Sequence, residues 1–141
     1  YGQKKLLKRA ISIIKPNYIF YFSSPKIYYD EKKNKKLLFY YKAIFKDYFE
    51  TIIKFVRENK TQTKIFYPST IFLSNKKKYF RYKSYLTSKE MAEKICRKKN
   101  NREYITCLRL PKLISRSNYN LLGYYEGKNI KILDKYYEKF F

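Results

Sequence analysis

The chain has 141 residues and carries 34 Lys and Arg against 11 Asp and Glu, a formal net charge of +23. Because a compact protein with this excess repels itself, we expect a polyanion as its partner, either a nucleic acid or an anionic membrane surface. The absence of His excludes imidazole metal sites, His-based acid–base catalysis and Ser-His or Cys-His nucleophiles. No apolar run reaches the roughly 18 residues that a membrane-spanning helix needs.

Aromatic residues are abundant, with 18 Tyr and 11 Phe. Many stand beside cations, as in the run from Lys78 to Lys83, and this interleaving suits contact with phosphates and stacking on bases. The codon bias of an AT-rich genome produces the same composition, and it stays open as the origin. Such a genome would fit an organelle or a parasite.

The remaining reactive residues form no recognisable site. Cys96 and Cys107 are eleven residues apart, which is typical of neither a redox pair nor a zinc site, so we expect small apolar fillers. The carboxylates form no Asp-x-Asp pair, and there is no Gly-rich phosphate loop. We therefore expect no enzyme, no catalytic residue, no metal, no cofactor and no small-molecule substrate. A metal-dependent nuclease and a membrane-surface protein stay as alternatives.

Residues 1–35 are predicted to be a basic N-terminal extension. The segment from Lys4 to Lys15 predicts a short amphipathic helix, either a basic arm laid on a partner or a segment resembling a transit peptide. Pro25 and the polar run 30–35 indicate a boundary after it.

Regular patterns follow from Lys36. Leu37, Phe39 and Tyr41 alternate with their neighbours along the chain, and this alternation predicts a strand over 36–43. Asp47 begins a helix whose apolar stripe runs to Val56 and which ends near 58–60. A second strand is expected over 64–73, with a proline that indicates an edge or a bulge.

Residues 73–102 are predicted to form a long β-hairpin. Its extended arm over 79–85 leads to a polar tip at 87–90, and residues 91–96 form a short helical turn or begin the return strand. A strand over 104–110, a helix opened by Pro111 and a strand over 130–133 complete the order β-α-β-β-α-β. The predicted fold class is α+β, ferredoxin-like, with a long protruding β-hairpin, the basic extension and a tail at 134–141.

Short segments in this order carry a family resemblance. They are Lys42-Ala43, the run 71–77, Ser88-Lys89, Glu93-Lys94-Ile95, Pro111 and the run 127–132. With them, residues 36–133 resemble the universal small-subunit ribosomal protein ten family in an organellar version.

The resemblance implies a structural constituent of the small-subunit head that supports translation. Its partners would be the 3′ major domain of the rRNA and the small-subunit proteins three, nine and fourteen, with no membrane. It would work in a mitochondrion, or alternatively in a plastid-type organelle. Another basic RNA-binding or mitoribosome-specific protein is the alternative.

The predicted rRNA contacts lie on the two arms of the hairpin, where cations would displace counterions from phosphates. The alternative is that each cationic run is a solvated loop. Tyr79, Tyr82 and Tyr85 either stack on bases or pack on neighbouring proteins. The predicted contacts are Lys76, Lys77, Lys78, Tyr79, Arg81, Lys83, Ser84, Lys89, Arg97, Lys98, Lys99 and Arg102.

Overall fold

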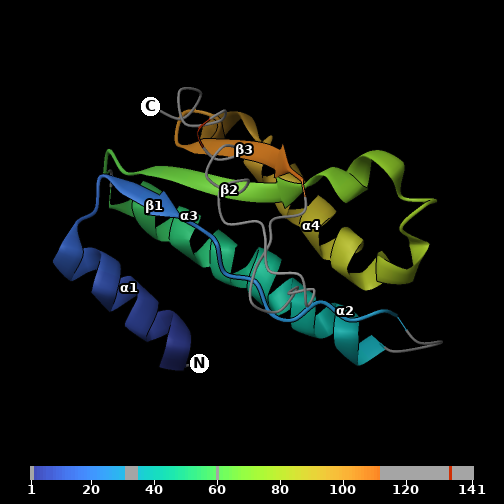
Figure 1. Ribbon diagram of the computed structural model, residues 1–141. Coiled ribbons are helices and arrows are strands. Elements are labelled where there is room, and N and C mark those ends of the chain that lie inside the picture. Colours follow the sequence, from blue (N-terminus) through green and yellow to red (C-terminus); the bar gives the residue numbers. More distant parts are fainter. Residues whose placement is uncertain (1, 31–34, 60, 112–133, 135–141) are drawn as a thin grey trace.

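A three-stranded parallel sheet with helices on one side organises the chain (Figure 1). The computed structural model describes residues 2–30, 35–59, 61–111 and 134. The strands stand in the order β1-β2-β3, with Ile65 of β2 paired to Ile19 on one side and to Ile105 on the other. The mixed α and β class is confirmed. The elements are α1 (Gly2–Ile14), β1 (Tyr18–Phe20), α2 (Lys35–Lys42), α3 (Phe49–Glu58), β2 (Lys64–Thr70), α4 (Lys83–Cys96) and β3 (Ile105–Leu110).

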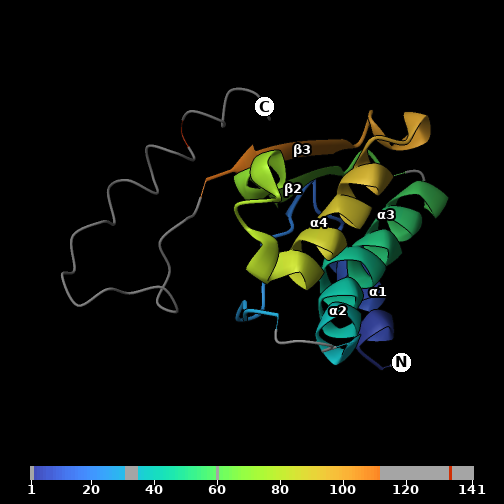
Figure 2. The same ribbon diagram turned by 90° about the vertical axis from the view of Figure 1, so that its right-hand side faces the viewer.

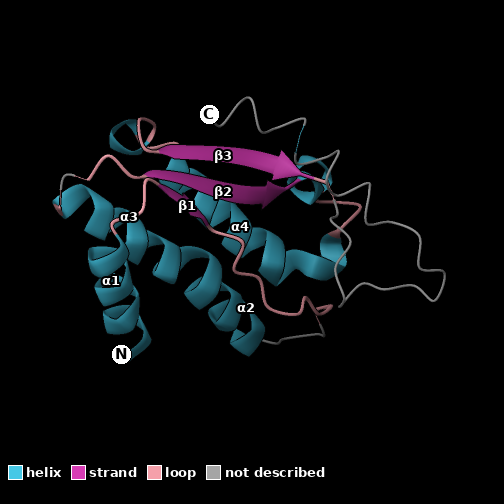
Figure 3. Cartoon of the chain, turned by 60° about the vertical axis from the view of Figure 1, so that its left-hand side comes forward, coloured by secondary structure: helices cyan, strands magenta, loops and turns pink. Residues whose placement is uncertain are grey.

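Two helical connections join the three strands. A π-helix (Ala43–Tyr48) links α2 to α3 in the first connection, and 3-10 helices at Ile71–Asn75 and Phe80–Tyr82 precede α4 in the second. The strands stand in the sheet in the same order as in the sequence. Two right-handed crossovers in such a sheet place their helices on the same face. Figures 2 and 3 show α3 and α4 together on one face.

The main core lies between that face and the helices. From α3 it takes Phe49, Ile52, Ile53 and Val56, all buried. A second core cluster gathers where α2 meets the start of α4, around Tyr41, Phe45, Leu73, Tyr85 and Leu86.

The predicted extension supplies part of this structure. Ile11 of α1 and Tyr21 after β1 are buried in the main core, and β1 pairs with β2. The predicted helix at Lys4–Lys15 is confirmed, as are the helix that ends near residue 58 and the strands that begin near 64 and 105.

The strand predicted over 36–43 is wrong, because residues 36–42 belong to α2 and Ala43 begins the π-helix. Tyr41, Phe45 and Phe49 are fully buried, at four-residue spacing, so one helical face and not an alternating one meets the core. The sequence has no Gly or Pro between residues 35 and 58, and the helical path continues from α2 through the π-helix into α3.

The hairpin predicted over 73–102 is also wrong. Residues 83–96 form α4, and the strands that flank it run parallel to each other, which requires a crossover connection and not a hairpin. The ferredoxin-like order therefore lacks its first strand and its hairpin here. The predicted helix after Pro111, the strand over 130–133 and the tail beyond Asp134 lie outside the described residues.

Candidate functional site

A polar stripe on α4 lies against the end of β2. Tyr85, Lys89 and Glu93 follow one another at four-residue spacing, so they share one face of the helix. All three side chains are buried, which is rare for Lys and Glu. Their partners are the last three residues of the strand, namely Thr70 for Tyr85, Pro68 for Lys89 and Ser69 for Glu93.

Lys89 is the most unusual member of this stripe. It is 6% exposed, and its Nζ donates a hydrogen bond to the Pro68 carbonyl at 2.7 Å. The same nitrogen lies 4.3 Å from the ring centroid of Phe45 and 4.8 Å from that of Tyr67. Burial disfavours the ammonium form and lowers the pKa of Lys89 to about 7. The amine therefore changes charge near neutral pH.

Tyr85 lies one helical turn before Lys89, in the first turn of α4. Its ring meets those of Tyr41 and Phe45 edge-on, with centroids 6.1 and 5.4 Å apart. Burial raises the pKa of Tyr85 to about 12, and the hydrogen bond with Thr70 lowers it in part. The phenol is protonated at neutral pH and held in one orientation.

Thr70 joins the phenol to the end of β2. Its hydroxyl oxygen accepts a hydrogen bond from the Phe72 backbone N–H at 3.3 Å. Thr70 also shares a side-chain hydrogen bond with Tyr85, so its hydroxyl lies between the Phe72 N–H and the phenol. Thr70 is also the last residue of β2, and ligands of parallel α/β sheets bind at the carboxyl ends of the strands.

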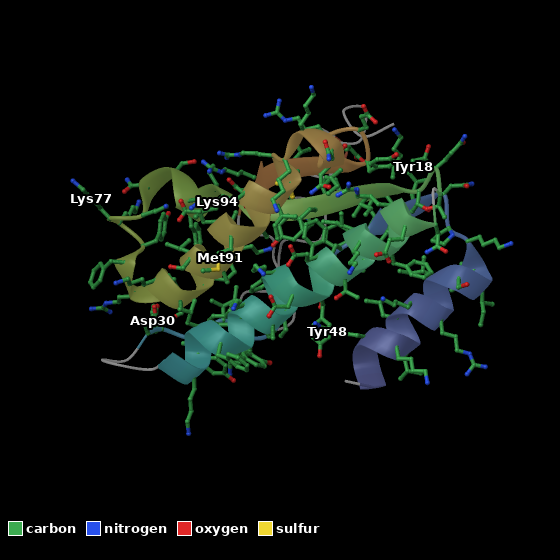
Figure 4. The ribbon with its side chains drawn as sticks, turned by 180° about the vertical axis from the view of Figure 1, so that it is seen from behind. Tyr18, Asp30, Tyr48, Lys77, Met91 and Lys94 are labelled. Atoms are coloured by element: carbon green, nitrogen blue, oxygen red, sulfur yellow. The ribbon has the colours of Figure 1, made fainter. Side chains whose placement is uncertain are left out.

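The start of α4 is held by a residue from the segment after β1. The carboxylate of Asp30 accepts a hydrogen bond from the Ser84 backbone N–H at 2.6 Å, and the Asp30 N–H donates to the Arg81 carbonyl at 2.6 Å. A carboxylate at a helix N-terminus satisfies an unpaired N–H and opposes the helix dipole. Figure 4 shows Asp30 beside the first turn of α4. Asp30 thus fixes the turn that carries Tyr85.

The exposed cations among the predicted rRNA contacts fall into two groups. Lys76, Lys77 and Lys78 lie in the turn before α4, and Lys77 points away from the molecule in Figure 4. The helix of 14 residues, about 21 Å long, lies between this group and the cations that follow it. The first group also contains Arg81 and Lys83, and the second contains Arg97, Lys98, Lys99 and Arg102.

Several of these residues already have partners within the chain. Lys76 forms an ion pair with Glu90 at 2.7 Å. Tyr79 stacks on Phe72 with ring centroids 4.1 Å apart, and Ser84 uses its backbone N–H to bind Asp30. The prediction of a phosphate contact is wrong for Lys89, because its amine is buried against β2.

The Tyr85–Lys89 pair is a site that sequence patterns alone do not reveal. The available signal is a Tyr and a Lys four residues apart, which becomes a shared helix face only if the segment is helical. In the predicted hairpin, Lys89 belongs with the exposed cations and Thr70 has no role. The true arrangement depends on α4 packing against the end of β2.

Comparison of the chain with protein-family models, with curated proteins and with solved structures finds no match. None of the helices described in the structure is long and apolar enough to span a bilayer.

Proposed function

We propose that this chain is an acid–base catalyst that moves a proton to or from the oxygen of a carbonyl or alcohol substrate. In this proposal Tyr85 transfers the proton, Lys89 stabilises the phenolate that forms, and Thr70 hydrogen-bonds the substrate oxygen. The observation that carries the proposal is the buried Lys89 amine, one helical turn from a buried phenol at the carboxyl end of a parallel strand.

The burial of Lys89 carries a free-energy cost, and a functional role for the amine would explain why it is present. Burying an amine beneath two aromatic rings costs more free energy than burying an apolar side chain of similar size. A strongly perturbed titrating group beside another titrating group is typical of a functional site. Tyr85 and Lys89 both have pKa values shifted chiefly by burial, and they lie one helical turn apart on α4.

The proposed chemistry assigns one role to each of the three side chains. When a hydride from an externally supplied carrier adds to the carbonyl carbon, the neutral Tyr85 phenol donates its proton to the oxygen that becomes negative, and the product is an alcohol. The ammonium form of Lys89 lowers the free energy of the resulting phenolate. In the reverse direction the phenolate accepts the proton of an alcohol. The Thr70 hydroxyl supplies a second hydrogen bond to the oxygen that gains charge.

Tyr85, Lys89 and Thr70 can transfer a proton and stabilise charge, but they cannot supply the electron pair of a reduction. That electron pair has to come from a hydride carrier. Parallel α/β sheets commonly bind nicotinamide dinucleotides at the carboxyl ends of their strands. The usual Gly-rich pyrophosphate loop does not fit this sequence, whose three glycines stand at positions 2, 123 and 127. We therefore assign no step to such a carrier and supply it in the assay.

The test is turnover of a panel of aldehydes, ketones and secondary alcohols with NADH, NADPH or their oxidised forms, followed by nicotinamide absorbance. Tyr85→Phe is expected to lower kcat by about 100-fold or more, because general acid–base catalysis contributes at least this much. Tyr40→Phe, at an exposed tyrosine of α2, is the matched control and is expected to leave kcat unchanged. Equal turnover in Tyr85→Phe and the wild-type protein would exclude this role.

The exposed cations favour a second candidate, binding to a polyanion. Lys77, Lys78, Lys98 and Lys99 extend into solvent at the two ends of α4, and the whole chain carries a net charge of +23. The family resemblance would make this polyanion the rRNA of a small organellar ribosomal subunit, with head proteins as neighbours. Without the hairpin, what supports this candidate is the exposed charge.

A further inference from the structure

The third member of the α4 stripe, Glu93, is tied to both neighbouring strands. Its Oε1 accepts hydrogen bonds from the Ser69 hydroxyl at 2.6 Å and from Arg109 Nε at 2.8 Å. Its Oε2 accepts from Arg109 Nη2 at 2.8 Å and from Arg97 Nη2 at 2.7 Å. Ser69 belongs to β2 and Arg109 to β3, so one carboxylate joins α4 to the two strands beneath it.

Glu93 is an ionised group in a buried position. Its side chain is 4% exposed. Burial by itself would raise the pKa of Glu93, but the hydrogen bonds from Arg109 and Ser69 outweigh burial and leave the pKa lowered. The carboxylate is therefore negative at neutral pH, one helical turn after Lys89.

We propose that Glu93 is a positioning residue for the Tyr85–Lys89 pair, an inference that rests on the proposed function. Its two-pronged contact with Arg109 and its contact with Ser69 fix the register of α4 against β2 and β3. Tyr85 and Lys89 stand on the same helix face, so this register places them opposite Thr70 and Pro68. The negative charge of Glu93 also favours the ammonium form of Lys89 over the neutral amine.

Three other titratable groups face Lys89, one each from α4, β2 and β3. On α4 the Cys96 thiol, and on β2 the Tyr67 phenol, have raised pKa values and are neutral at neutral pH. On β3 the hydrogen bond from Cys96 lowers the pKa of Cys107, so this thiol is the second group able to bring negative charge to Lys89. The remaining neighbours, Phe45 and the Pro68 carbonyl, do not titrate.

The test follows the Lys89 amine directly by NMR of the lysine side chains across a pH series. The Lys89 signal is the one that is missing in Lys89→Met. We expect it to titrate near pH 7 in the wild-type protein and at lower pH in Glu93→Gln, because the charge of Glu93 raises the pKa of Lys89. Cys107→Ser is measured beside it, because the Cys107 thiol also raises the pKa of Lys89 and its loss should lower the midpoint as well. Glu58→Gln, at an exposed carboxylate of α3, is the matched control and is expected to leave the midpoint unchanged.

Removing one partner of a buried ion pair can prevent folding, so a second variant accompanies the first. The double variant Glu93→Met with Arg109→Met replaces the pair by apolar side chains and also lacks the negative charge. A Lys89 signal that titrates at the wild-type pH in both the single and the double variant would overturn the inference.

A kinetic readout separates this inference from the proposed function. If both hold, Glu93→Gln moves the pH dependence of kcat to lower pH with the Lys89 titration, while KM stays within about twofold. If Tyr85→Phe keeps full activity but the Lys89 signal still shifts in Glu93→Gln, the proposed function fails and the electrostatic coupling remains. If Tyr85→Phe is inactive and Glu93→Gln changes neither the titration nor the pH profile, the positioning role fails alone.

Discussion

Lys89 Nζ donates a 2.7 Å hydrogen bond to the carbonyl of Pro68, and this bond sets an amine from α4 beneath the carboxyl end of a parallel strand. The nitrogen can make two further hydrogen bonds, yet its neighbours on the other sides are the faces of Phe45 and Tyr67. A cation gains from such faces, but less than it loses by leaving water. The hydrogen bond therefore fixes the position of the amine. Its charged and neutral forms remain close to each other in free energy.

The first prediction concerns the effect of Lys89 on stability. We expect Lys89→Met to leave the free energy of unfolding unchanged or to raise it by about 1–2 kcal/mol, because an apolar chain of similar length replaces a buried amine. The same variant is expected to lower kcat by about 100-fold. Urea unfolding and the carbonyl panel measure the two effects. A loss of stability together with unchanged turnover would identify Lys89 as a structural residue.

The second prediction is a pH dependence of stability. The pKa of Lys89 is about 7 in the folded state and near its ordinary 10.5 when the chain is unfolded, so the unfolded state binds more protons between these values. The free energy of unfolding should therefore rise as the pH is raised from 7 toward 10, by at most about 1.4 kcal/mol per unit from this residue. Stability is lost again as the pH falls toward 7.

The measurement is urea unfolding at several pH values between 7 and 9.5. This range stays below the region in which Tyr85, with its pKa raised to about 12, opposes the trend above pH 10. Lys89→Met is expected to flatten the profile relative to wild type. Parallel profiles for the two proteins would mean that the Lys89 amine is solvated in the folded state.

The third prediction concerns the cap of α4. Asp30→Ala should lower the free energy of unfolding by about 1 kcal/mol, the usual effect of losing a side-chain cap at a helix N-terminus. Asp30→Asn keeps an acceptor oxygen for the Ser84 N–H and is expected to recover most of this loss. Thermal unfolding followed by circular dichroism compares the three proteins. Identical transitions would show that the cap contributes no stability.

Much of the fold follows from sequence patterns, but the region around Tyr85 does not, for a physical reason. The helix over 49–58 is recognisable because its buried positions are apolar and spaced at helical intervals. The buried positions of α4 include Ser88, Lys89 and Glu93, so its hydrophobic period is weak and the helix is hidden. The buried polar side chains that give α4 its proposed chemistry also weaken the hydrophobic period by which a helix is recognised in a sequence.

The alternation before α4 is misleading for a related reason. Phe80 alternates with Arg81, which is typical of a strand, but Phe80 is 67% exposed and does not enter the core. Composition separates exposed cations from buried ones poorly. Lys77 and Lys89 stand in equally polar surroundings in the sequence, and only the packing of α4 on β2 distinguishes them.

The fourth prediction tests the second candidate function. Lys76→Glu with Lys77→Glu and Lys78→Glu should weaken binding to a transcript of the 3′ major domain of small-subunit rRNA. It should also reduce the slope of log K against log salt by about 0.7–0.9 for each phosphate that the variant no longer neutralises. Lys54→Glu, at an exposed cation of α3 paired with Glu58, is the control. An equal decrease in affinity for both proteins would indicate nonspecific attraction to the net charge.

The proposed chemistry requires that the Lys89 amine of α4 titrate close to neutral pH, one helical turn from Tyr85. A pH titration of the Lys89 side chain by NMR measures this property on the full chain and without a substrate. We expect a midpoint near pH 7 for Lys89, well below the midpoints of exposed lysines such as Lys77. A midpoint near 10.5 would show that Lys89 is an ordinary solvated lysine and would rule out the proposed role.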